Sequence, residues 1–196
     1  IIMLTSQGLR GDAFRMKSIG FSGYLNKPVR RSLLYDCLMM VLNQDNQKIK
    51  SGDREEAFVT SYHVSEEKKK KLHILLAEDN KINQKVALSL LRKYGFNVDS
   101  VDNGRQAVAA LEKRDYQIVL MDIQMPEMDG LSATKMIRDP DSKVKNHDVL
   151  IIAMTAHAMK RDRDLCLKTG MDDYISKPLK PEKLFQLIEK YMEKIV

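Results

Sequence analysis

One stretch near the middle of the chain limits its possible folds more than any other. Residues 118–121 are all apolar, the run ends at Asp122, and the loop that follows carries Pro126 and Gly130. An apolar run of this length, bounded by turn residues, is typical of a strand buried on both faces of a parallel sheet. In open α/β sheets, the carboxyl ends of the strands form the edge at which ligands bind. We therefore expect Asp122 to lie at a functional edge.

Three further strands are predicted at residues 73–77, 149–154 and 174–176, and each of them is followed by polar side chains. These side chains are the adjacent acids Glu78 and Asp79, the hydroxyl of Thr155, and Lys177, which precedes Pro178. If the strands are parallel, three carboxylates, a hydroxyl and an ammonium group converge at one sheet edge.

Helical segments alternate with the strands from Leu72 onward. Asn80 can cap a helix, and a further strand is predicted at residues 96–101. The apolar face expected for that first helix consists of Ile82, Val86, Leu90 and Leu91. Further helices are expected at residues 104–113, from 131 to about 140, at 157–167 and at 182–195. Five strand–helix units with right-handed crossovers predict an α/β fold with a doubly wound parallel sheet over residues 71–196.

The beginning of the chain repeats a later part of it. Residues 1–34 align without a gap to residues 151–184, and nine positions are identical. Three of the identities pair Thr5 with Thr155, Tyr24 with Tyr174, and Lys27 with Lys177. We therefore expect residues 1–45 to form a βαβα half-domain, equivalent to the second half of the later domain, whose first half lies outside this chain.

Residues 46–70 are polar and charged, and they are interpreted as a linker between the two copies. Residues 58–62 could form a short strand, although a loosely ordered connector is the favoured interpretation. The two cysteines, Cys37 and Cys166, lie among apolar residues and are expected to be buried thiols.

The composition excludes several classes of function. No apolar run approaches the roughly 18 residues that a membrane span needs, so we expect no membrane contact by these residues. The net charge of +6 resides mainly in the first 50 residues, and no nucleic-acid-binding motif is evident. We therefore expect no binding to nucleic acid.

Clustered carboxylates repel one another unless a cation lies among them. Oxygen ligands without histidine or cysteine favour Mg²⁺. Asp122 could be a metal ligand, a nucleophile that forms an aspartyl phosphate, or both. Lys177 would supply a fixed positive charge, and Thr155 a hydrogen-bond donor for a phosphoryl oxygen. The Lys177–Pro178 bond could be cis or trans.

These motifs resemble the receiver domain of bacterial response regulators, and the similarity covers residues 72–196. It includes the acidic pair, the loop after Asp122, the strand-terminal Thr155 and the Lys-Pro dipeptide. The resemblance implies a flavodoxin-like fold with strand order 2-1-3-4-5, which is common among doubly wound α/β proteins. It also implies that Asp122 is the phosphoacceptor. Glu78, Asp79 and the main-chain carbonyl of Gln124 would help to hold Mg²⁺.

The same resemblance assigns Thr155 and Tyr174 as a switch pair and Lys177 as the contact to the phosphoryl group. Thr5, Tyr24 and Lys27 are their counterparts in the half-receiver. Together, these features are similar to receivers of hybrid sensor histidine kinases. The implied partners are a histidine kinase core or a histidine phosphotransfer domain, and the implied location is cytoplasmic, in a parent kinase that can be membrane-anchored.

The implied activity is phosphoryl acceptance, with no enzymatic activity beyond self-phosphorylation and self-dephosphorylation. Two alternatives stay open. One is an interaction module that never carries phosphate. The other is a Mg²⁺-dependent phosphohydrolase of the dehalogenase-like type, which needs a second Asp where this chain has Gln124. The half-receiver is expected to pack on the complete domain or, preferably, to form a homodimer through its exposed strand edge.

Overall fold

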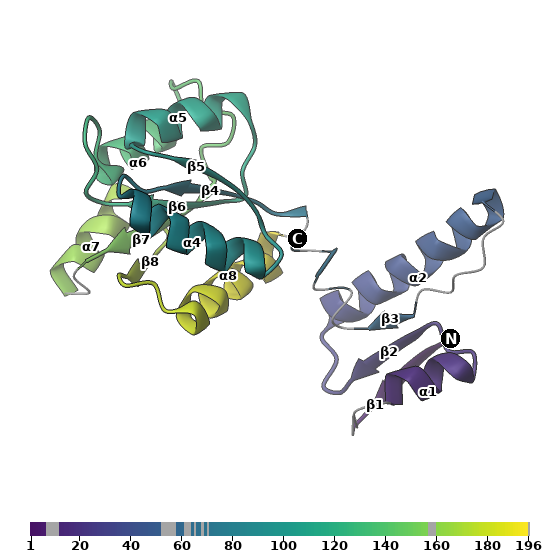
Figure 1. Ribbon diagram of the computed structural model, residues 1–196. Helices are drawn as coiled ribbons and strands as arrows, with labels where there is room; N and C mark the ends of the chain where they lie inside the picture. The colour runs from purple at the N-terminus through teal and green to yellow at the C-terminus, as the bar shows by residue number, and fades with distance from the viewer. Residues whose placement is uncertain are drawn as a thin grey trace. The chain divides into compact units, whose positions relative to one another are not determined.

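The computed structural model describes residues 1–6, 12–51, 58–60, 64, 66–67, 69, 71–156 and 160–195. The chain divides into two compact units, Ile1–Lys68 and Lys69–Val196, which we call unit 1 and unit 2 (Figure 1). Among the described residues, no helix combines the length and the apolar character needed to span a bilayer.

Unit 2 is a five-stranded parallel sheet with the order β5-β4-β6-β7-β8, covered by helices on both faces (Figure 1). This order equals 2-1-3-4-5 when the strands of unit 2 are counted along the chain, so the predicted fold is confirmed. The strands are β4 (His73–Ala77), β5 (Asn97–Val101), β6 (Ile118–Asp122), β7 (Leu150–Thr155) and β8 (Asp173–Ser176). The helices are α4 (Lys81–Lys93), α5 (Gly104–Lys113), α6 (Gly130–Arg138), α7 (Lys160–Thr169) and α8 (Pro181–Ile195). The start predicted for α7, residues 157–159, lies outside the described residues.

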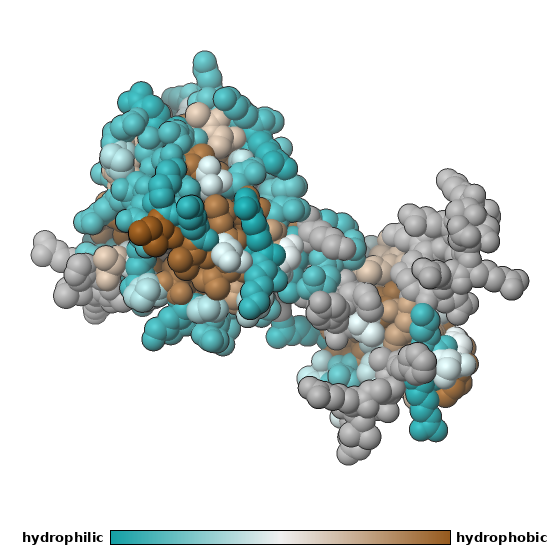
Figure 2. All heavy atoms as spheres, in the orientation of Figure 1, coloured by the Kyte–Doolittle hydropathy of each residue, from teal (hydrophilic) through white to brown (hydrophobic). Residues whose placement is uncertain are grey.

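Helix α4 is oriented differently from the sequence prediction. Its buried residues are Gln84, Ala87 and Leu91, whereas Ile82 is 74% exposed and Val86 is 51% exposed. On the face of unit 2 where Figure 1 shows α4, Figure 2 shows hydrophobic surface surrounded by hydrophilic side chains. The prediction that Ile82 and Val86 lie on the apolar face toward the core was wrong. The helix face that packs on the sheet instead includes a polar residue, Gln84.

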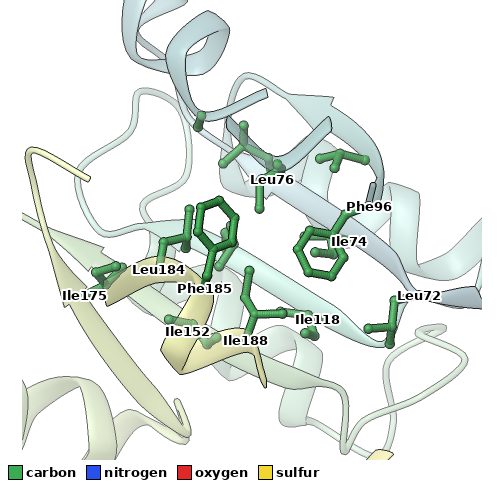
Figure 3. Packing of buried hydrophobic residues seen from close by; sticks show 14 of the residues in the cluster. Leu72, Ile74, Leu76, Phe96, Ile118, Ile152, Ile175, Leu184, Phe185 and Ile188 are labelled. Carbon is green, nitrogen blue, oxygen red and sulfur yellow. The ribbon is translucent and has the colours of Figure 1, made fainter. Parts of the chain in front are cut away.

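Two hydrophobic clusters fill the space between the sheet and its helices. On one face, α4 and α8 pack against the sheet, and Figure 3 shows Leu184, Phe185 and Ile188 of α8 pointing toward the strands. On the other face, α5, α6 and α7 pack against alternate strand residues, and Cys166 is buried there. Because successive strand residues point to opposite faces, strands buried on both sides must be apolar throughout. This requirement explains the continuous run before Asp122.

Unit 1 is a three-stranded parallel sheet with the order β1-β2-β3. Its elements are β1 (Ile2–Thr5), α1 (Asp12–Ser18), β2 (Gly23–Asn26), α2 (Arg31–Ser51) and β3 (Val59–Thr60). The register of β1 with β2, from Ile2 opposite Gly23 to Thr5 opposite Asn26, equals the register of β7 with β8 after a shift of 150 positions. The repeat in the sequence is therefore also a repeat in backbone geometry.

Two described parts of the predicted linker, residues 46–70, belong to regular elements. Helix α2 continues to Ser51, and Val59 and Thr60 form β3, which pairs in parallel with Gly23 and Tyr24. Val59 is buried with Leu25 and Cys37 in the core of unit 1. A short strand can form here because β2 offers it an edge to pair with, which the local composition does not reveal.

Candidate functional site

The carboxyl ends of β4 and β6 deliver the central acids of the site. These strands are neighbours, and Ala77 of β4 lies opposite Met121 of β6. The residue after Ala77 is Glu78 and the residue after Met121 is Asp122, so the two acids are neighbours at the ends of these strands. The two acids line a cleft of about 320 Å³ at this edge of the sheet, together with Asp79, Thr155 and Lys177. The structure thus brings together five of the residues predicted for the site.

Glu78, Asp79 and Asp122 form a group whose potential ligand oxygens all lie within 4.8 Å of one another. Glu78 is 2% exposed and Asp122 is 6% exposed, whereas Asp79 is exposed to solvent. A hard cation with oxygen ligands, such as Mg²⁺, suits this set of donors, because no histidine or cysteine is among them. Gln124 also borders the cleft.

The ammonium group of Lys177 lies between the two buried acids. Its Nζ is 2.6 Å from Oε2 of Glu78 and 2.6 Å from Oδ2 of Asp122. Burial raises the pKa of the Asp122 carboxyl above its ordinary value, although the hydrogen bond from Lys177 acts in the opposite direction. Desolvation lowers the pKa of Lys177, but the hydrogen bonds to Asp122 and Glu78 outweigh it, so the pKa is raised. Lys177 is therefore a stable cation that balances only one of the two negative charges.

The loop after Asp122 needs glycine at one position. A Cβ atom added to Gly130 would lie 2.2 Å from the main-chain oxygen of Asp122 and 2.9 Å from Cγ of Met121. Gly130 donates a main-chain hydrogen bond of 2.9 Å to Ile123, and Asp129 caps α6 by accepting from the amide of Ser132. The first turn of α6 is thus packed directly on the end of β6, which fixes the backbone of Asp122.

Two residues of α4 that were given no role from the sequence hold Glu78 in place. Asn83 donates from Nδ2 to Oε1 of Glu78 at 3.0 Å, and Gln84 donates to the main-chain oxygen of Glu78 at 3.1 Å. Asn80 caps the same helix, as predicted, by accepting from the amides of Ile82 and Asn83. The positions of Asn83 and Gln84, four to six residues after the acidic pair on a capped helix, were the available signal.

The remaining predicted residues lie at the ends of β7 and β8. Thr155 is buried and borders the cleft, and the bond between Lys177 and Pro178 is cis. Tyr174 is half-buried in β8, opposite Ala153, and the guanidinium carbon of Arg163 lies 5.4 Å from its ring centroid. Tyr174 is thus placed beside α7 and is not among the residues that line the cleft.

The three counterparts in unit 1 occupy equivalent backbone positions. Lys27 donates its main-chain N–H to Thr5 at 2.6 Å, as Lys177 does to Thr155 at 2.7 Å, and the bond after Lys27 is also cis. Tyr24 is 8% exposed and pairs with Thr60 of β3. Within the described part of the chain, the only group of three possible metal-binding residues is the one in unit 2.

Comparisons with known proteins agree with this geometry. The family model for the response regulator receiver domain matches residues 74–189. The chain is 32% identical over 207 residues to probable histidine kinase 6 of Oryza sativa subsp. japonica, and 32% identical over 212 residues to histidine kinase 2 of Arabidopsis thaliana. These matches cover 97% and 98% of this chain but only 20% and 17% of the two relatives.

Solved structures of receiver domains show the same similarity. The receiver domain of a sensor histidine kinase from Pseudomonas aeruginosa, described with a magnesium ion coordinated in its active site cleft, is 41% identical with a TM-score of 0.56. That comparison covers 62% of this chain and 98% of the other. The receiver domain of Ssk1 from Saccharomyces cerevisiae, solved with the histidine phosphotransfer protein Ypd1, is 28% identical with a TM-score of 0.57, over 64% of this chain and 92% of that chain.

Proposed function

Because the chain belongs to the response regulator receiver domain family, we propose that unit 2 accepts a phosphoryl group on Asp122 within a two-component phosphorelay. The observation that carries the proposal is the arrangement of Glu78, Asp79, Asp122 and Lys177 in one cleft. Two buried carboxylates share one ammonium group there, which leaves a negative site that suits a divalent cation and a phosphoryl donor.

In the proposed reaction, a carboxylate oxygen of Asp122 attacks the phosphorus of a phosphohistidine. The new O–P bond forms as the N–P bond breaks, and the electron pair stays on the imidazole nitrogen, which takes up a proton. Mg²⁺, held by Glu78, Asp79, Asp122 and the carbonyl of Gln124, would neutralise charge on the phosphoryl oxygens. Lys177 moves its hydrogen bond from the carboxylate to a phosphoryl oxygen, and Thr155 donates to another.

The proposed donor is a histidine phosphotransfer protein or the kinase core of a hybrid histidine kinase. The similarity to plant histidine kinases and to a receiver solved with such a phosphotransfer protein supports this proposal. Exposed Ile82 and Val86 offer an apolar surface on α4, the helix whose first residues border the cleft. A helix of the donor could pack there and bring its phosphohistidine to Asp122.

We propose that residues 1–45 are the second half of another receiver, with Thr5, Tyr24 and Lys27 in place of Thr155, Tyr174 and Lys177. Support comes from the shared strand register and from relatives that match nearly the whole chain. A bacterial source and a cytoplasmic location stay predictions. The two similar kinases described above are plant proteins, and the two similar structures described above come from a bacterium and a yeast.

A phosphorylation experiment tests the acceptor. Acetyl phosphate and Mg²⁺ should produce one base-labile acyl phosphate, which Asp122→Asn should abolish and a chelator should suppress, because the nucleophile or the charge-neutralising ion is lost. Asp115→Asn, which changes an exposed Asp just before the other end of β6, is the matched control and should label normally. A second arm replaces acetyl phosphate with a phosphorylated histidine phosphotransfer protein.

Undiminished labelling of Asp122→Asn would refute the assignment. If the wild type takes up no phosphate from either donor, the interaction-module alternative replaces the proposal. A phosphohydrolase would instead release phosphate from added phosphomonoesters with repeated turnover. The amide of Gln124 cannot act as the general acid and base that such turnover needs.

A further inference from the structure

Both carboxylate oxygens of Glu78 are bound by protein donors. Lys177 binds Oε2 at 2.6 Å, and the side-chain amide of Asn83 binds Oε1 at 3.0 Å. The two donors differ in charge, since Lys177 carries a full positive charge and the Asn83 amide carries none. A divalent cation that enters the cleft must compete with the ammonium group for Glu78, but the amide does not repel it.

Neighbouring residues hold the backbone of Glu78 as well. Its N–H donates to the main-chain oxygen of Val101 at 3.1 Å, and its C=O accepts from Gln84 at 3.1 Å. Gln84 is 7% exposed and also donates to Asp102 at 3.0 Å. The backbone is therefore fixed from two sides, which leaves the direction of the carboxylate as the remaining variable.

Asn83 is placed to fix that direction. It lies at the solvent-exposed border of the cleft, in the first turn of α4, and its own N–H is bound by the cap residue Asn80 at 3.2 Å. When Lys177 turns from Glu78 toward a phosphoryl group, the bond from Asn83 to Oε1 can persist. Outer residues that hydrogen-bond to a metal ligand orient it and raise metal affinity.

We propose that Asn83 is a positioning residue, which holds the Glu78 carboxylate in the direction that a divalent cation requires. This inference rests on the proposed function, because it assumes that the cation occupies the acidic group. It extends that function by assigning a role to a side chain that itself carries no charge and need not contact the ion.

The test is a Mg²⁺ titration of the full chain, followed by amide chemical shifts and without any phosphoryl donor. Asn83→Ala should weaken Mg²⁺ binding about tenfold, the lower end of the range known for such outer residues. Ser89→Ala, an exposed change later in the same helix, is the matched control and should bind within about twofold of the wild type on the same scale. Metal-free melting temperatures should be equal for all three proteins, because a loss of affinity caused by partial unfolding would lower this temperature.

A double-mutant cycle separates positioning from direct ligation. In a Glu78→Ala background, adding Asn83→Ala should change the affinity no further, because no carboxylate remains to be held. The initial slope of the titration, which scales with affinity, permits this comparison even where binding does not saturate. A further loss in that background would overturn the inference, since Asn83 would then act on the ion by another route.

The outcomes for the two proposals are distinguishable. If the wild type binds Mg²⁺ and Asn83→Ala binds it equally well, the positioning role is wrong and the proposed function stands. If the wild type binds no Mg²⁺, the proposed function is wrong, and so is this inference.

Discussion

At the scale of single residues, the site is held in a state of unbalanced charge. Glu78 and Asp122 are both buried, and Lys177 supplies one positive charge to the two of them. Burial of a carboxylate is unfavourable unless its charge is compensated. The Asp122 carboxylate that serves the proposed function therefore destabilises the folded state. A bound cation would compensate its charge and remove this destabilisation.

The pH dependence of stability should follow from Asp122. Burial raises its pKa in the folded protein, while in the unfolded chain the pKa stays near about 4. Between these two values the folded state binds more protons, so stability falls as the pH rises through this window. The raised pKa of Lys177 has its effect at high pH, where the stabilisation is lost as the pH rises through that pKa. It does not affect this window.

We therefore expect Asp122→Asn to stabilise unit 2 at neutral pH without metal, and the gain to fade as the pH falls below the window. Adding Mg²⁺ should raise the stability of the wild type, because the ion binds only the folded state, and should do little for the variant. Urea unfolding of residues 69–196, with chelator and with Mg²⁺, measures both effects. A variant that is less stable than the wild type at neutral pH in chelator would contradict this account.

At the scale of elements, the ends of β7 and β8 connect the cleft to α7. Thr155 ends β7 inside the cleft, and Tyr174 of β8 lies beneath Arg163 of α7. These are neighbouring parallel strands, with Thr155 opposite Ser176. A movement of Thr155 toward a phosphoryl group would vacate space next to α7, into which the ring of Tyr174 can move. The two strand ends and α7 are thus the proposed two-state element.

Thr155→Ala tests this coupling. The variant should still accept phosphate on Asp122, because the nucleophile and its acidic neighbours are intact. It should lose most of the amide shift changes that beryllofluoride causes in β8 and in the described part of α7, since the hydroxyl that senses the added group is gone. Thr169→Ala makes the same chemical change at the end of α7 and should keep these shifts. Equal shift changes in Thr155→Ala and the wild type would rule out the switch pair.

At the scale of the whole molecule, unit 1 resembles part of unit 2 but lacks one neighbour. Strand β7 lies between β6 and β8, whereas its counterpart β1 pairs only with β2 among the described strands. Unit 1 also exposes several large apolar side chains: Ile1, Leu4, Ile19, Tyr35, Leu38 and Leu42. A strand edge with no neighbour among the described strands, beside exposed apolar residues, favours association with another chain.

We expect residues 1–196 to form a dimer and residues 69–196 to be monomeric. Two copies of β1 can pair about a two-fold axis, which closes the assembly at two chains. Light scattering over a range of concentrations measures the mass of both proteins. Leu4→Lys, which places a charge on β1, should return the full chain to a monomer. A monomeric wild-type chain at high concentration would rule out the dimer.

The sequence by itself determined the fold of unit 2, the repeat in unit 1 and the charged residues of the site. These conclusions depend on local patterns, since an apolar run that ends in Asp122 defines both a buried strand and the position of its carboxylate. The shift of 150 positions likewise predicted two related copies, and the strand registers of β1 with β2 and of β7 with β8 match under the same shift.

Only the tertiary structure decided the features that depend on contacts between distant segments. The buried face of α4 is chosen by the sheet, so Gln84 is inside and Ile82 is outside. Strand β3 exists because β2 provides an edge for it. Lys177 lies between Glu78 and Asp122, and the three residues follow or end three different strands. No local sequence pattern specifies the distances between these strand ends. Pairing and packing across the chain fix these features, and periodicity along the chain carries no information about them.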